Sequence, residues 1–311
     1  MVAGEFSKGN NVMRVQRLRL AALSAIAAVV APASAQETGT APPAAPAAAA
    51  AAQAPPPPTA EERQRLVAIS QRGIQIFEIA RAGLLSTQDM LSQIPDPAAA
   101  GIVGWVATPE GEGLGVVYYA DGPQGPVAVY RGQVVGGRVA SRDVYSGADR
   151  PALTATHRRM AAARAAVAGL DRQPCAGAFN VIVIPPASAE APIEVYKLSP
   201  QTQRGRYPAG GHFLATVAPD GTVSSTSDLA ARCVDLSPGD STPLAGAGAP
   251  ARPLSIGHSG PLPTEIHVFL SLLMNRPLLV TTAEPARVWS VARGRIGMVG
   301  GVRVPPPGPG R

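Results

Sequence analysis

Three histidines and one glutamate are the residues whose types and spacing could hold a metal ion. His258 lies in a glycine-rich stretch, and Glu265 and His267 follow it where a helix is expected to begin. Imidazole and carboxylate groups are common zinc ligands. Because Glu265 and His267 are two residues apart, they face different sides of a helix, and only one of them can join His258. The third ligand must come from elsewhere in the chain, and His212 is the candidate.

Residues 257–296 resemble the JAB/MPN family of metalloproteases, which has a His-Ser-His-Pro loop followed by a Ser and by an Asp at a helix start. Four positions match this pattern: His258, Ser259, Pro261 and Thr264. Gly260 replaces the second zinc-binding histidine, and His267 stands in the Asp position. The family also has a Glu on an earlier strand, and Glu194 lies on a suitable one. The resemblance implies a mixed fold of sheet and helices with an altered metal site.

The two cysteines, Cys175 and Cys233, form an even pair. In an oxidising compartment such a pair is expected to form a disulfide, and the alternative is two buried free thiols. Neither cysteine lies in a CxxC motif, which gives no support to redox catalysis or to a cysteine-based zinc site.

The N-terminus has the pattern of a secretory signal peptide. Arginines precede a short apolar run over residues 20–32, and Ala33-Ser34-Ala35 provides small residues for cleavage. The run is shorter than the roughly 20 residues of a transmembrane helix, so we expect residues 1–35 to be removed rather than retained as an anchor. Residues 36–58 are mainly Ala and Pro and predict a disordered linker. The mature protein is therefore expected in the periplasm or outside the cell.

The formal charge of +6 does not indicate binding to nucleic acid. All but two of the 27 basic residues are Arg, and the exceptions are Lys8 and Lys197. Together with abundant Ala, Gly and Pro, this bias is typical of a GC-rich bacterium. Because basic residues do not cluster with aromatic ones, nucleic acid is excluded as the expected partner.

The first part of the folded region combines helices with a meander of strands. A Thr59–Glu62 capping box and an apolar stripe predict a helix that begins at residue 60, and a second short helix is expected over residues 87–94. Four Val- and Tyr-rich segments joined by short glycine-containing turns then predict antiparallel strands. Those segments are residues 102–107, 114–120, 127–131 and 138–145.

The second part repeats the order of helix and then strands. A helix is expected over residues 151–170, and a later one begins near Pro263 and ends at Met274. Residues 235–253 are expected to be a loop, with His258 on an irregular segment after it. The expected strands are residues 180–184, 193–198, 212–218, 222–227, 278–282 and 287–291, the last reaching as far as 296.

These patterns predict an α+β fold with mainly antiparallel strands over residues 59–296, with possible subdomains 59–149 and 150–296. Residues 297–311 are expected to be a Pro/Gly-rich tail. The sequence as a whole indicates an exported, non-catalytic cell-envelope module that needs no cofactor and binds an envelope protein or a surface ligand. The alternative is a secreted zinc hydrolase or peptidase that uses His258 with His212 and either His267 or Glu265.

Overall fold

The computed structural model of this protein describes residues 55–230, 232–240 and 253–300. The expected signal peptide, most of the linker before the first helix, and most of the C-terminal tail lie outside these residues. No helix in the described part of the chain is both long and apolar enough to span a membrane.

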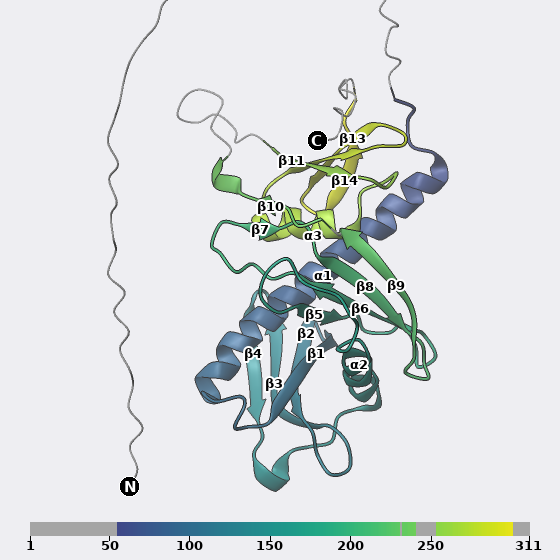
Figure 1. Ribbon diagram of the computed structural model, residues 1–311. Coiled ribbons are helices and arrows are strands. Elements are labelled where there is room, and N and C mark those ends of the chain that lie inside the picture. Colours follow the sequence, from purple (N-terminus) through teal and green to yellow (C-terminus); the bar gives the residue numbers. More distant parts are fainter. Residues whose placement is uncertain (1–54, 231, 241–252, 301–311) are drawn as a thin grey trace, which may run out of the picture. The chain divides into compact units, whose positions relative to one another are not determined.

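The described residues confirm an α+β fold with mainly antiparallel strands (Figure 1). The α-helices are α1 (Ala60–Gln93), α2 (Ala155–Ala166) and α3 (Glu265–Met274). The first sheet has the order β1 (Ile102–Glu110), β2 (Gly113–Ala120), β3 (Val127–Val135) and β4 (Arg138–Val144). The second has the order β5 (Asn180–Val183), β6 (Ile193–Leu198), β8 (His212–Val217) and β9 (Val223–Ala230). The third has the order β11 (Leu254–His258), β12 (Leu278–Thr282), β13 (Arg287–Ala292) and β14 (Arg295–Met298). A small ribbon pairs β7 (Tyr207–Pro208) with β10 (Asp235–Leu236).

Helix α1 begins at the predicted capping box, in which the Thr59 side chain accepts from the Glu62 N–H and the Glu62 carboxylate accepts from the Thr59 N–H. The prediction of a separate helix over residues 87–94 was wrong, because α1 continues through this segment to Gln93. Thr87 resembles a helix-starting residue in the sequence. Its hydroxyl instead donates to the Gly83 carbonyl at 2.7 Å, one turn earlier in the same helix, and so does not cap a new one.

Helix α2 is shorter than the predicted segment 151–170 and occupies Ala155–Ala166. The residues before it extend the first sheet, because Ala152 bridges to Val127 and the Leu153 N–H donates to Pro126. Thr154 then caps the helix by accepting from the His157 N–H. Pairing with the neighbouring sheet therefore sets the start of α2.

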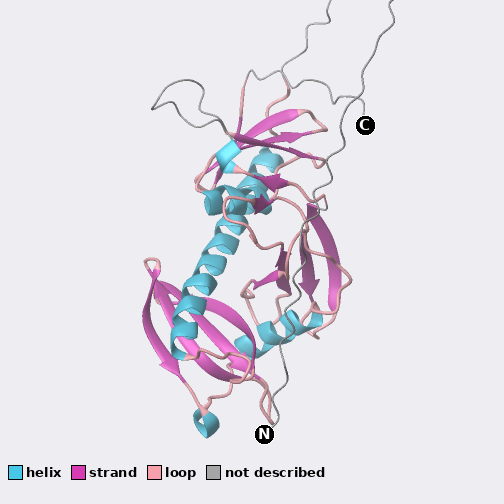
Figure 2. Cartoon of the chain, turned by 60° about the vertical axis from the view of Figure 1, so that its left-hand side comes forward, coloured by secondary structure: helices cyan, strands magenta, loops and turns pink. Residues whose placement is uncertain are grey.

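The predicted meander is confirmed, with β1 to β4 paired in chain order. Helix α1 lies against this sheet along its C-terminal half and against α3 and β14 along its N-terminal half (Figures 1 and 2). The close contact with α3 occurs at Gly73, where an added Cβ would lie 2.5 Å from the Cβ of Val268. A glycine is therefore needed where the two helices meet.

The second sheet is covered on both faces. Alternate residues of β6 belong to different core clusters, with Ile193 and Val195 packed beside α2, and Tyr196 and Leu198 packed in the cluster that contains α1 and α3. Such two-sided burial explains why nearly every residue of β6 is buried. Both clusters combine residues from the two possible subdomains, 59–149 and 150–296.

The third sheet differs from the prediction at two places. Residues 254–258 were expected to lie in irregular structure, but they form β11, which pairs in parallel with β12. The chain crosses between these two strands through α3, which makes a β–α–β unit in an otherwise antiparallel structure. At the other end, the predicted extension of the last strand to residue 296 was wrong, because the chain turns at Arg293-Gly294 and returns as β14. Residues 297 and 298 thus belong to a strand and not to the tail.

Candidate functional site

His267 occupies the third position of α3 and completes a capping box with Thr264. Its Nδ1 accepts from the Thr264 backbone N–H at 2.9 Å, so the neutral ring carries its hydrogen on Nε2. The side chain is buried. Burial, and to a smaller extent the nearby His258, lower the pKa of His267 to about 3. In this arrangement neither ring nitrogen offers a free lone pair to a metal ion.

His212, at the start of β8, is held in the same way. Its Nδ1 accepts from the Ser199 N–H at 3.2 Å, and its Nε2 donates to the Pro208 carbonyl at 3.0 Å. The ring is fully buried, and burial lowers the pKa of His212 to about 4. Both ring nitrogens therefore bond to backbone groups. These two hydrogen bonds connect β8 to the end of β6 and to β7.

His258 lies at the end of β11, and its ring packs edge-on against that of His267, with the centroids 5.1 Å apart. Burial lowers the pKa of His258 as well. A Cβ at Gly260 would lie 2.6 Å from His258 Nε2, so the glycine at this position leaves room for the ring. The structure thus brings together two of the predicted ligands.

Glu265, the remaining predicted ligand, is oriented by a different partner. Its carboxylate accepts from the Tyr196 hydroxyl at 3.0 Å. Burial first, and then Glu265 and Glu194, raise the pKa of Tyr196 above its ordinary value, so the phenol stays protonated and donates. Within the residues that the structure describes, no three His, Cys, Asp or Glu side chains are grouped as metal ligands. The chemistry available here is hydrogen bonding that positions α3 on β6.

A cavity of about 130 Å³ lies on the α2 side of the second sheet, a feature that the sequence reasoning missed. Its lining residues come from the segment after α2 and from β6, β8 and β9. They are Leu170, Asp171, Arg172, Lys197, Phe213, Leu214, Ala215 and Thr226. The lining therefore combines apolar side chains with three charged ones, Asp171, Arg172 and Lys197.

Lys197 is the buried cation of this cavity, with 5% of the residue exposed. Its ammonium donates to the carbonyls of Val167 and Leu170, both at 3.3 Å, where the end of α2 presents unpaired carbonyl oxygens. The nitrogen also lies 4.7 Å from the centroid of the Phe179 ring. Burial, with a contribution from Arg172, lowers the pKa of Lys197.

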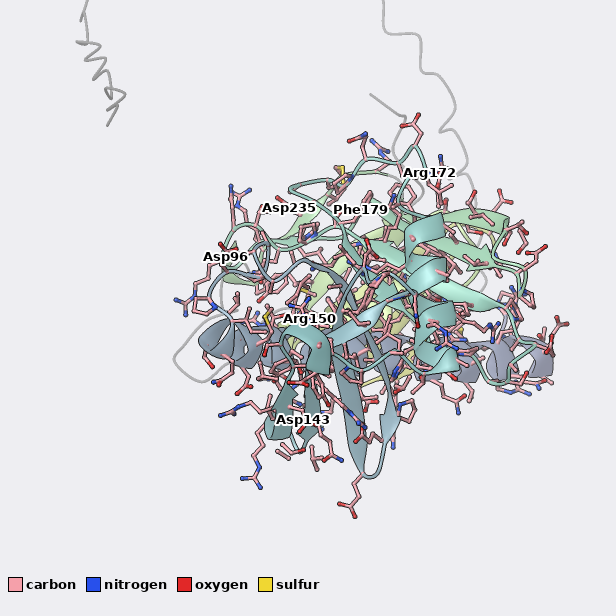
Figure 3. All side chains as sticks on the ribbon, turned by 90° about the horizontal axis from the view of Figure 1, so that it is seen from below. Asp96, Asp143, Arg150, Arg172, Phe179 and Asp235 are labelled. Carbon is pink, nitrogen blue, oxygen red and sulfur yellow. A yellow bond between two sulfur atoms is a disulfide. The ribbon has the colours of Figure 1, made fainter. Side chains whose placement is uncertain are left out.

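Arg172 lines the cavity, and Phe179 lies on the same side of the molecule in Figure 3. The guanidinium of Arg172 pairs with Asp228 at 3.2 Å and stacks over Phe213, 5.6 Å from the ring centroid. The predicted disulfide between Cys175 and Cys233 is present and fixes the segment that follows Arg172. The chain beside the cavity is thus attached to the rest of the fold at several points.

One signal in the sequence could have found this site. Ile193, Val195 and Lys197 share one face of β6, so a cation stands where the alternation calls for an apolar residue. Lys197 is also one of only two lysines in a chain that otherwise uses Arg.

No protein-family model, no curated protein and no solved structure matches this chain. The resemblance to JAB/MPN metalloproteases consequently stays a prediction.

Proposed function

We propose that this chain is an exported module of the bacterial cell envelope that binds a ligand or partner and performs no catalysis. The observation that carries the proposal is the disulfide between Cys175 and Cys233. Disulfides persist in oxidising compartments such as the periplasm, and this one agrees with the leader and cleavage site expected from residues 1–35. An Ala/Pro-rich linker would then hold the folded part away from the membrane.

The hydrogen bonds of His212 and His267 fit a binding protein better than an acid–base catalyst. His212 and His267 each use Nδ1 to accept a backbone N–H, and the pKa of each is held low by burial. General acid–base catalysis favours a group whose pKa lies near the working pH. The cavity beside Lys197 offers a place for a ligand, which a binding module requires.

Expression of the full chain in a Gram-negative host tests this proposal. We expect the protein in the periplasmic fraction, with a mature N-terminus at Gln36 and with Cys175 and Cys233 linked in a non-reducing peptide map. A Cys175→Ser, Cys233→Ser double variant is the control for the disulfide assignment. An intact leader on a cytosolic protein with two alkylatable thiols would contradict the proposal.

The close pair formed by His258 and His267 favours a second candidate, the secreted zinc hydrolase or peptidase that the resemblance implies. Binding of zinc through His267 Nε2 would require its Nδ1 to give up the Thr264 N–H, so metal binding should perturb the start of α3. Metal analysis of the purified protein tests this candidate. Stoichiometric zinc that is lost in a His258→Ala variant would support this candidate. Absence of zinc from the unaltered protein, together with the same result in peptidase assays of both proteins, would exclude it.

A further inference from the structure

The ammonium of Lys197 has only neutral partners. Two of its three N–H groups point to the carbonyls of Val167 and Leu170, and the nitrogen lies 4.7 Å from the centroid of the Phe179 ring. Among the described residues no carboxylate lies within ion-pair distance of this nitrogen. Arg172, which also lines the cavity, has a charge of the same sign and contributes to the lowered pKa of Lys197. A buried charge is costly without a partner, and an anion in the cavity would supply one.

The shape of the site limits what such an anion can be. A cavity of about 130 Å³ is close to the ~150 Å³ of an engineered apolar cavity that accepts benzene. Phe213, Leu214 and Ala215 provide an apolar part of the lining. The body of the ligand is therefore apolar and about the size of one aromatic ring or a short acyl chain.

Two further groups add selectivity. Asp171 lines the exposed side of the cavity, where it would repel a second negative charge. The charge of Arg172 is already balanced by Asp228, which reduces its attraction for a second carboxylate. A molecule with one carboxylate is favoured over a dicarboxylate.

We propose that this cavity binds a small apolar monocarboxylate, with the carboxylate paired to the ammonium of Lys197 and the apolar body against Phe213. The inference rests on the proposed binding function and names the chemical class of its ligand. Lysine suits the position because its compact ammonium has three donors, enough for two carbonyls and one anion.

A structural role for Lys197 as a cap on α2 predicts a different outcome, so binding assays separate the two. The full chain, purified with its disulfide intact, is titrated by calorimetry with benzoate, with its neutral analogue benzyl alcohol, and with the dicarboxylate terephthalate. We expect saturable binding of benzoate that is at least tenfold tighter than that of the other two compounds. Equal binding of benzoate and benzyl alcohol, or no saturable binding of benzoate at millimolar concentration, would overturn the proposal.

Variants then assign the site. Lys197→Met keeps most of the length of the side chain and removes the charge. It should weaken benzoate binding at least tenfold and leave the binding of benzyl alcohol unchanged. Arg159→Met is the matched control, because Arg159 on α2 also donates to two backbone carbonyls, those of Ser188 and Ala191, but does not line the cavity. It should bind benzoate as the unaltered protein does. Unchanged affinity for benzoate in a folded Lys197→Met variant would refute the assignment.

A second variant serves if Lys197→Met fails to fold. Thr226 is exposed on the edge strand β9 and lines the cavity, so Thr226→Phe can fill the space from the solvent side. It should abolish benzoate binding with Lys197 intact, and retention of full affinity would contradict the proposal. Failure of every ligand assay would leave leader processing and the disulfide map unaffected, so it is distinguishable from failure of the proposed export.

Discussion

His212 and His267 show how a histidine can serve structure at the cost of acid stability. Each ring accepts a backbone N–H through Nδ1 in a buried position. Protonation would turn that acceptor into a donor directed at another donor and would place a charge in the core. Both rings therefore keep the neutral form in the folded protein.

The first prediction follows from these two groups. Their folded pKa values lie below the ordinary histidine value of about 6.5, so stability is present above that pH and is lost as the pH falls toward 4. Burial of His212 alone corresponds to a loss of about 3 kcal/mol between pH 7 and pH 4. Urea unfolding at the two pH values, followed by circular dichroism, measures this loss.

A variant isolates the contribution of His212. His212→Asn retains an acceptor for the Ser199 N–H but does not titrate in this range, so the stability difference between pH 7 and pH 4 should shrink by a few kcal/mol. His157→Asn, at a half-buried position on α2, is the control and should keep most of the difference. An equal loss in the His212→Asn variant and the unaltered protein would contradict the explanation.

At the scale of elements, α1 organises the fold because it contacts both the first sheet and α3. Two glycines permit these contacts. An added Cβ at Gly83 would lie 2.6 Å from the Trp105 ring, and one at Gly73 would lie 2.7 Å from the Glu265 carbonyl oxygen. Glycine weakens a helix intrinsically, so its presence here reflects the need for close packing.

The second prediction concerns Gly73. In an exposed helix Gly→Ala stabilises, but Gly73→Ala should destabilise the protein by about 2 kcal/mol because the backbone of α3 cannot move away freely. The unfolding midpoint in urea measures the effect. Gly169→Ala is the control, since no atom lies within 4 Å of its added Cβ, and it should change stability little. A stable Gly73→Ala variant would show that α1 and α3 are farther apart.

The third prediction tests the start of α1. Thr59→Ala removes the hydroxyl that accepts from the Glu62 N–H and should lower the free energy of unfolding by about 1 kcal/mol. Thr59→Ser keeps the hydroxyl and should retain most of the stability. Similar losses in both variants would mean that the hydroxyl does not contribute.

At the scale of the whole molecule, two contacts join parts that are far apart in the chain. Arg287 on β13 is buried, and its guanidinium donates to the Glu62 carboxylate at 2.9 Å, linking the first helix to the last sheet. This bond lowers the pKa of Glu62. The disulfide joins the segment after α2 to the residues before β10, and the Cys175 N–H also donates to the Ser199 hydroxyl at 2.8 Å. The disulfide thus links the chain before β5 to the chain after β9, the two edge strands of the second sheet.

The fourth prediction concerns that disulfide, which spans 58 residues. Its removal should lower the free energy of unfolding by about 4 kcal/mol, because the unfolded chain regains the freedom that the cross-link takes away. Urea unfolding with and without reductant measures the difference. The Cys175→Ser, Cys233→Ser variant should match the reduced protein and show no response to reductant. An unchanged midpoint on reduction would contradict the prediction.

The sequence by itself determined those features that depend on neighbouring residues. Thr59 and Glu62 fix the start of α1 through a local pair of hydrogen bonds, and the turns of the meander are too short for anything except antiparallel neighbours. The two cysteines left one intramolecular pairing, which the structure contains.

Only the tertiary structure decided the rest, because the deciding partners lie far away in the chain. The hydroxyl of Thr87 in α1 lies 2.6 Å from that of Tyr118, which is 31 residues away in the chain. Strand β11 pairs with β12, which the chain reaches only after α3. The roles of His212 and His267 depend on which backbone groups surround each ring. Lys197 became a candidate ligand-binding residue for the same reason. The end of α2 and strand β8 lie around it, and no local sequence pattern specifies that these elements pack beside β6.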